Sequence, residues 1–289
     1  MRTDITYVNN NGKTVQFGGS DEDLHYLQHD LRANSWTYET GVAKTRISSF
    51  KHGLKEKKLP VGIMAKTAKE GIAKSNYIAQ IGEYDIMAKR PGRLYVGDWY
   101  LSCWIVGVSF SNYWLSDCIA EIELSLVCEK CEWIHETTTQ YAPITMQDSD
   151  AILGADFEYD FEHDLAGSAS SHMLDVPGVF DAQFLWRVYG PATNPYIRIG
   201  DNTYKINTSV REGQTLEVDT AQKTIVLIDE QGRRTSILSE RARGAKGSGS
   251  YIFEPIHPGT QTVTYDNTYL FDITLYEMRS LPPFELGGR

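Results

Sequence analysis

Hydrophobic and polar positions alternate with strand periodicity near the start of the chain. Two such runs, Thr3–Val8 and Lys13–Phe17, flank the polar sequence Asn9-Asn10-Asn11-Gly12. Asn-Gly between alternating runs is typical of a β-hairpin turn, because both residues tolerate positive φ angles. We therefore expect a β-hairpin over these residues.

A first short helix is predicted directly after the hairpin. Ser20 followed by Asp23 resembles a capping box, in which the side chains of the two residues satisfy exposed backbone groups. Leu24, Leu27 and Leu31 then recur with helical spacing and form one apolar stripe.

A second and longer helix is predicted after Thr67, where Thr67 and Glu70 form a cleaner capping box. We expect this helix to run to about Ala88, because Pro91-Gly92 cannot continue it. Its predicted apolar face comprises Ile72, Ile78, Ile81 and Tyr84.

Long strands complete the first half. Leu59–Ala65 and Leu94–Phe110 are rich in strand-forming residues, and Cys118–Cys128 alternates strictly. The face expected to point inward in the last of these comprises Cys118, Ala120, Ile122, Leu124, Leu126 and Cys128.

The second half has the rhythm of a β-sandwich, with short strands separated by turn signals. Glycine and serine dominate Gly244–Ser250, which we expect to be a loop. The predicted strands are Asp156–Glu162, Gln183–Tyr189, Tyr196–Ile199, Thr203–Val210, Thr215–Val218, Thr224–Asp229, Tyr251–Pro255, Gln261–Tyr265 and Tyr269–Tyr276.

The charge distribution changes abruptly in the middle of the chain. Residues 44–74 carry nine basic residues against two acidic ones, whereas residues 148–164 carry seven acidic residues and no basic one. Between these blocks, Glu136–Gly154 is polar and aperiodic, as expected of a linker. We therefore predict two domains, covering residues 1–145 and 146–289.

The overall composition is that of a folded protein, with 41% hydrophobic and 23% charged residues. A net charge of −10 disfavours nucleic-acid binding through the bulk field of the protein. The sequence contains no apolar window long enough to predict a membrane span, and Met1–Asp4 lacks the apolar core of a secretion signal. Four cysteines are too few for a disulfide scaffold, so we expect reduced thiols.

Candidate chemistry is sparse. Cys128 and Cys131 form a C-x-x-C motif followed by His135, but zinc usually requires two such pairs, and Cys128 also fits the inward face of its strand. The acidic block 148–164 has the oxygen ligands that calcium prefers but not the calcium-loop pattern, and strict alternation with aromatic residues favours a solvated strand face.

No catalytic signature is present either, since His163, His172 and His257 are isolated and no nucleophile motif occurs. We therefore predict no catalytic, cofactor-binding or metal-binding residues. For the basic block 44–74, a protein interface is at least as well supported as a phosphate site, because Gly53, Pro60 and Gly62 interrupt it.

The order of several local patterns resembles the distal tail proteins of bacteriophages with long, non-contractile tails. In the first half these are Gly18-Gly19 before the short helix, Leu59–Ile63 before the longer one, and Arg90–Leu101, which is similar to the family's Pro-Gly turn and strand. In the second half they are Tyr189–Pro195 and Phe271–Pro282.

The resemblance implies a mainly β protein. Its N-terminal domain would be a ring-forming split barrel or sandwich with two helices, and its C-terminal domain a galectin-like β-sandwich. Six copies would form a ring at the distal end of the tail tube, in contact with the tail tube protein, the tail-tip hub protein and receptor-binding or fibre proteins. Such a protein has no enzymatic activity, needs no cofactor, and is assembled in the cytoplasm of the bacterial host.

Two alternatives remain open at this point. A carbohydrate-binding module would need an exposed aromatic platform, yet the single tryptophan of the second half, Trp186, is expected to point inward. A glycosidase would need a carboxylate pair, and no motif marks one. The charge blocks 44–74 and 148–164, with net charges of +7 and −7, could also align neighbouring subunits.

Overall fold

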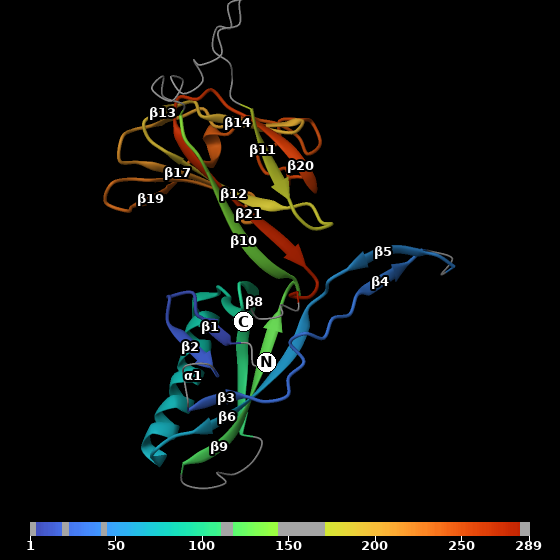
Figure 1. Ribbon diagram of the computed structural model, residues 1–289, viewed down its shortest axis with the longest axis vertical. Coiled ribbons are helices and arrows are strands. Elements are labelled where there is room, and N and C mark those ends of the chain that lie inside the picture. Colours follow the sequence, from blue (N-terminus) through green and yellow to red (C-terminus); the bar gives the residue numbers. More distant parts are fainter. Residues whose placement is uncertain (1–3, 19–22, 42–44, 111–117, 144–170, 284–289) are drawn as a thin grey trace, which may run out of the picture. The chain divides into compact units, whose positions relative to one another are not determined.

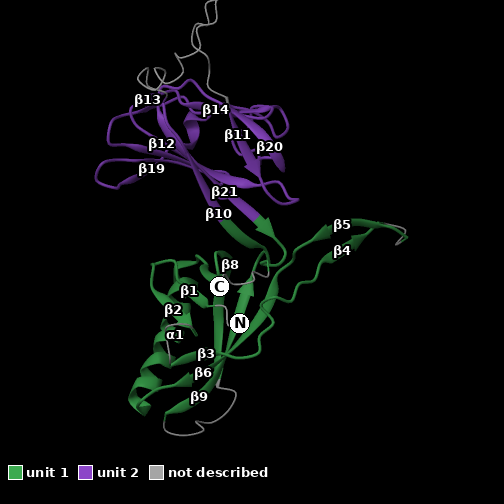
Figure 2. Cartoon of the chain, viewed as in Figure 1, with its two compact units in different colours: residues 1–135, 278–289 green, residues 136–277 purple. Residues whose placement is uncertain are grey.

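A computed structural model describes residues 4–18, 23–41, 45–110, 118–143 and 171–283. The chain divides into two compact units, one made of residues 1–135 and 278–289 and the other of residues 136–277 (Figure 2). The division that we predicted between residues 145 and 146 lies outside the described residues and stays a prediction.

Unit 1 consists of antiparallel strands and one long helix (Figure 1). Its strands are β1 (Ile5–Val8), β2 (Thr14–Phe17), β3 (Leu24–Tyr26), β4 (Thr37–Thr40), β5 (Ile47–Lys51), β6 (Lys55–Met64), β7 (Gly92–Val96), β8 (Trp99–Phe110) and β9 (Ile119–Cys128), with the first part of β10 (Trp133–Tyr141). Its helix is α1 (Ala68–Ala88).

Strand β8 organises this unit because it belongs to two ladders. One ladder has the order β2-β1-β7-β8-β10 and the other the order β8-β9-β6-β3. The two end strands of this combined order, β2 and β3, approach each other where the Gly18 amide donates a 2.6 Å hydrogen bond to the Leu24 carbonyl. The described strands therefore form a partly wrapped sheet rather than a closed barrel.

The opening hairpin and the longer helix are confirmed. Strands β1 and β2 pair from Ile5↔Phe17 to Val8↔Thr14, with Gly12 in the turn at a φ of 77°. Helix α1 begins after Thr67, whose hydroxyl accepts a hydrogen bond from the Glu70 amide at 3.2 Å.

The predicted short helix at Ser20–Leu31 is wrong in its described part. Leu24–Tyr26 forms strand β3, which pairs with β6 from Leu24↔Ile63 to Tyr26↔Val61. The backbone groups at the edge of β6 offer registered partners, and such tertiary pairing overrides a weak local helix signal. The described part of unit 1 therefore has one α-helix and not two.

The apolar face predicted for the longer helix needs correction. Ile78 and Ile81 are buried, but Ile72 and Tyr84 are exposed. The buried face includes small and polar residues instead, because a Cβ atom at Gly82 would lie 2.9 Å from the Cβ atom of Ile105. Close packing of α1 against β8 therefore requires small residues on the buried face of the helix, and a search for hydrophobic residues alone does not identify them.

The predicted strand Leu94–Phe110 is in fact a hairpin. Strands β7 and β8 pair from Gly92↔Cys103 to Val96↔Trp99, and Gly97 takes a φ of 62° in the turn between them. Strand β9 agrees with its predicted inward face from Ala120 to Cys128, all of whose members are buried, whereas Cys118 precedes the strand.

Unit 2 contains two antiparallel sheets. The first has the order β19-β18-β17-β12-β21-β10 and the second the order β11-β20-β14-β15, with β13 and β16 as a separate pair. The strands are β11 (Ser171–Val176), β12 (Gln183–Tyr189), β13 (Ala192–Thr193), β14 (Tyr196–Ile199), β15 (Asn202–Lys205), β16 (Ser209–Val210), β17 (Thr215–Asp219), β18 (Thr224–Ile228), β19 (Arg234–Ser236), β20 (Gly259–Thr264) and β21 (Leu270–Arg279). A 3-10 turn, η2 (Leu238–Glu240), follows β19.

The two sheets share one apolar core, so the predicted β-sandwich is confirmed. Trp186 on β12 and Val263 on β20 belong to the same buried cluster, to which β21 contributes Phe271. Alternation along β12 is complete, with Phe184, Trp186 and Val188 all buried.

Three local predictions for the second half need correction. Tyr251–Pro255 is not a strand, because Ile252 and Phe253 fill the core from a turn. Thr203–Val210 is divided between β15 and β16. The predicted linker starts too early, since residues 136–141 complete β10 and the Tyr141 ring stacks on Phe271 with centroids 4.8 Å apart. The strand predicted at Asp156–Glu162 lies outside the described residues.

Candidate assembly surfaces

The cysteine motif lies in the core of unit 1. Cys103, Cys128 and Cys131 are all buried, and all four cysteines are free thiols. The hydrogen bond with Cys103 raises the pKa of the Cys128 thiol. The hydrogen bond with Cys128 raises the pKa of the Cys131 thiol. Burial raises both pKa values further. Protonated, enclosed thiols are poor nucleophiles, so this cluster has a packing role.

No metal site is evident in the parts of the chain that the structure describes, where no group of three or more His, Cys, Asp or Glu side chains converges. Likewise, no described helix combines the length and the apolar character needed to cross a membrane.

Asp85 on α1 is a fully buried carboxylate, which makes it a candidate for a catalytic group. Its Oδ2 atom accepts a 2.6 Å hydrogen bond from the Tyr7 hydroxyl, and its Oδ1 atom accepts bonds from the backbone and side-chain nitrogens of Asn10 at 2.9 and 2.7 Å. Burial is the largest cause of the strongly raised pKa of Tyr7. Asp85 is fully enclosed, so we assign it to fastening the opening hairpin to the end of α1.

The most distinctive surface of unit 1 is the hairpin of β4 and β5, a two-stranded sheet of its own (Figure 1). Tyr38 lies opposite Phe50, and Trp36 stacks on His52 with ring centroids 3.7 Å apart. By the alternation of a strand, these four rings share one face of the hairpin. We call this set of residues the aromatic face.

The other face of the same hairpin is polar. Glu39 accepts hydrogen bonds from Lys51 Nζ at 2.7 Å and Ser49 Oγ at 2.9 Å, and Thr37 donates to the Lys51 carbonyl at 2.7 Å. The hydrogen bond from Lys51 is the largest cause of the lowered pKa of Glu39. Amphipathic alternation normally directs apolar residues into a core, yet Tyr38 is 63% and Phe50 61% exposed.

The base of the hairpin is attached to unit 1. His52 Nε2 lies 3.1 Å from Ser280 Oγ, and Lys55 Nζ donates to Ser35 Oγ at 2.8 Å. Isolated two-stranded hairpins are marginally stable in water. A hairpin with a fixed base and an uncovered aromatic face has the properties expected of an assembly arm.

A second surface with exposed aromatic and aliphatic side chains lies on the solvent side of α1. Its residues follow at spacings of four and three, which places them in one row opposite the buried face. These are Ala73, Tyr77, Gln80, Tyr84 and Met87, and we call them the α1 row. Met87 is 82% and Tyr84 46% exposed. A depression of about 530 Å³ follows this side of the helix, and Glu83 is the charged side chain among its described lining residues.

The basic block 44–74 does not form one patch. It runs through β5, β6 and the start of α1, and several of its charges have acidic partners, as in Lys58–Glu123 and Lys74–Asp23, both at 2.8 Å. The acidic block 148–164 lies outside the described residues, so the alignment of subunits by these two blocks stays a prediction.

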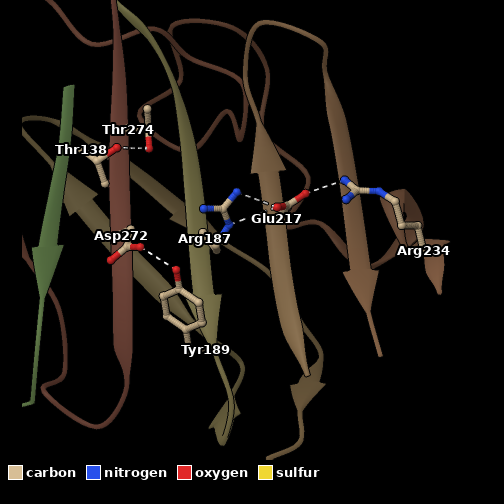
Figure 3. A network of polar contacts seen from close by, with 7 residues as sticks. All are labelled: Thr138, Arg187, Tyr189, Glu217, Arg234, Asp272 and Thr274. Atoms are coloured by element: carbon tan, nitrogen blue, oxygen red, sulfur yellow. Dashed lines mark hydrogen bonds and ion pairs between the residues drawn. The ribbon is translucent and has the colours of Figure 1, made fainter. Parts of the chain in front are cut away.

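Unit 2 presents a polar network on the β12-containing sheet (Figure 3). The Arg187 guanidinium donates two hydrogen bonds to Glu217 Oε1, at 3.0 and 2.9 Å, and Arg234 contacts Glu217 Oε2. Burial raises the pKa of the Glu217 carboxyl, but the two arginines outweigh it and hold that pKa below its ordinary value. The network ties β12, β17 and β19 together across the sheet.

Sequence reasoning missed the aromatic face and the α1 row. We interpreted the basic block 44–74 as a charged loop with strand edges, although the alternation of Trp36 and Tyr38 and of Phe50 and His52 is readable in the sequence. It was missed because lysines and arginines dominate that stretch.

The fold is similar to solved structures from phage tails. The Dit protein of phage SPP1, described as a paradigm of the hub adsorption apparatus in phages that infect Gram-positive bacteria, matches with a TM-score of 0.56 and 11% identity over 95% of this chain and 99% of that chain. Chains of the phage P2 baseplate in its activated conformation, with calcium and with strontium, match with TM-scores of 0.62 and 0.64.

Both baseplate matches have 10% identity and cover 98% of this chain and 100% of the other. No protein-family model and no curated protein matches the sequence. Identities of this size show a shared fold, and the coverage shows that the likeness includes both units.

Proposed function

We propose that this protein is a structural component of a phage tail, which forms a ring at the distal end of the tail tube and carries the tip, fibre or receptor-binding proteins. The likeness to hub and baseplate proteins along almost the whole chain carries this proposal. A shared sandwich domain alone would be weaker support, because such domains serve many functions.

The surfaces of unit 1 support self-association. An aromatic face and the α1 row are different surfaces of one unit, so a contact between them is heterologous. Heterologous contacts close into rings when the rotation between subunits divides the circle. In this proposal the ring is a homohexamer, unit 1 makes its contacts, and unit 2 is available to tail-tip partners.

The proposed role is mechanical and needs no cofactor or catalytic residue. The buried thiols and Asp85 already have packing and hydrogen-bonding roles in unit 1. The carbohydrate-binding alternative gains no support, because Trp186 lies in the sandwich core.

Gold-labelled antibodies against unit 2 test the location. We expect label at the end of the tail far from the capsid, and peptides of this chain in the mass spectrum of purified virions. Label on the capsid, or the absence of the chain from virions that infect normally, would refute the proposal.

A further inference from the structure

Unit 2 contains a small pocket beside its second sheet. The walls come from the turn between β14 and β15, the glycine-rich loop of residues 244–250, and the segment from Glu254 to β20 (Figure 1). The volume of the pocket is about 200 Å³, which suits one side chain rather than a larger molecule. We call it the loop pocket.

Hydrogen bonds hold the walls of the loop pocket in place. The Gly247 amide donates to Glu254 Oε2 at 2.9 Å, and Gln261 Nε2 donates to the His257 carbonyl at 3.1 Å. The Tyr204 hydroxyl donates to the Glu254 carbonyl at 2.8 Å. A pocket that is held in this way needs little ordering when a ligand enters, so less conformational entropy is lost on binding.

The polar groups that line the pocket are rich in hydrogen-bond acceptors. Asp201 and Glu254 are carboxylates, and Gln261 uses its amide nitrogen within the wall and keeps its Oε1 atom as an acceptor. The described lining contains no lysine or arginine, and Arg198 reaches Asp201 from outside the lining at 4.0 Å. The pocket therefore suits a ligand with positive charge and several donors.

The inner part of the pocket is apolar. Ile199, Tyr204 and Ile256 line it and also belong to the buried core of the sandwich. Arginine combines an apolar stem with a planar guanidinium that carries five donors, so it matches both the inner wall and the acceptors. The ammonium group of lysine has three donors and is more strongly hydrated, so it matches this arrangement less well.

We propose that the loop pocket binds an arginine side chain of a partner protein. This inference rests on the proposed function and specifies how unit 2 would hold a tail-tip partner. Residues 136–277 carry 10 basic and 21 acidic residues, a net charge of 10 − 21 = −11, which attracts a basic partner. Arginine is also enriched among the residues that dominate the binding energy of protein interfaces.

Methyl NMR of the full-length protein tests the pocket directly. Isoleucine δ1-methyl labelling places reporters at Ile199 and Ile256, while Ile78 and Ile81 in the core of unit 1 serve as internal references. We expect Nα-acetyl-arginine amide to shift the two reporter signals in a saturable way and to leave the references unchanged. The neutral isostere Nα-acetyl-citrulline amide should shift neither reporter.

Removal of the two carboxylates should weaken binding. Asp201→Asn with Glu254→Gln should raise the dissociation constant of the arginine probe about 10-fold or more, because both charged partners of the guanidinium are lost. Glu254→Gln keeps an oxygen that can accept from the Gly247 amide, so the melting temperature should stay unchanged. As a matched control, Glu212→Gln removes an exposed carboxylate outside the lining and should leave the dissociation constant unchanged.

Several results would overturn the proposal. These are equal shifts with the citrulline derivative, no saturable shift of the reporters, or an unchanged dissociation constant in the double variant. Tighter binding of Nα-acetyl-lysine amide would refute the choice of arginine. Reporter shifts with calcium chloride, and none with the arginine probe, would assign the pocket to a metal cation.

These outcomes are distinct from a failure of the proposed function. A pocket that does not bind arginine leaves the proposed tail location standing, because antibody labelling of virions tests that location independently. Conversely, absence of the chain from virions would remove the tail-tip partner and would not change the methyl shifts.

Discussion

At the residue scale, the buried glycines and the buried carboxylate of unit 1 serve close packing and hydrogen bonding rather than chemical reactivity. Gly92 and Gly82 allow strands and helix to approach closely, and Asp85 accepts hydrogen bonds from neutral donors in the opening hairpin, Tyr7 on β1 and Asn10 in the turn. Sequence reasoning identified the turn at Asn9–Gly12 but could not identify its partner on α1, because that contact spans about 75 residues of chain.

Substitution of Gly92 tests this packing. A Cβ atom there would lie 2.3 Å from Tyr7 Oη and 2.7 Å from Asp85 Oδ2. Gly92→Ala should therefore lower the free energy of unfolding by about 1–3 kcal/mol, through overpacking. In Gly107→Ala the nearest atom is 3.5 Å away, so this control should be close to neutral in urea unfolding. Equal stability of the two variants would contradict this account.

The Glu217 network predicts a pH dependence of unit 2. The pKa of the Glu217 carboxyl in the folded protein lies below its ordinary value of 4.5. The contribution of Glu217 to the free energy of unfolding is therefore present above pH 4.5 and is lost as the pH falls through the folded pKa. Glu217→Gln should cost about 1 kcal/mol at pH 7, because the pair is partly exposed.

Urea unfolding over a pH series measures this cost. The difference between the wild type and Glu217→Gln should shrink below pH 4.5, whereas the exposed control Glu212→Gln should show no difference at any pH. A Glu217→Gln deficit that persists unchanged at pH 3 would mean that packing, and not the ionised pair, is responsible.

At the scale of elements, local signals succeeded where they agreed with long-range pairing. The hairpin at β1–β2, helix α1, and strands β9 and β12 carry strong periodicity or caps, and each is confirmed. The prediction of a helix at the position of β3 was wrong because the pairing partner, β6, lies more than 30 residues away along the chain. A local sequence window around Leu24 does not contain that partner.

The cap of α1 gives a prediction at this scale. Thr67→Ala removes the acceptor for the Glu70 amide and should cost about 1 kcal/mol of unfolding free energy, whereas Thr67→Ser should retain most of it. Thermal unfolding of the three proteins measures the effect. Equal destabilisation by serine and alanine would show that the methyl group matters and the cap does not.

At the scale of the whole molecule, β class and the second-half sandwich were predictable because composition and alternation determine them. The exposed aromatic face and the α1 row were not predictable, because a sequence pattern cannot tell whether an apolar side chain points into the core of its own chain or toward solvent. The aromatic face and the α1 row follow the periodicities of buried elements and are nevertheless exposed.

The charge of the molecule predicts how assembly responds to salt. In the proposed ring, six copies would carry a net charge of 6 × −10 = −60, so electrostatic repulsion would oppose association at low ionic strength. Screening lengths fall to about 8–10 Å near physiological salt, which should favour association. Apparent mass by light scattering should therefore rise with sodium chloride in this range; a mass that falls with salt would show that attraction between charges dominates the interface.

The central claim is that this chain closes into a ring, and negative-stain electron microscopy of the concentrated, purified full-length protein tests it most directly. We expect class averages of closed rings with six-fold symmetry and a central opening. Monomers at every protein and salt concentration, or open fibres without closure, would contradict the claim.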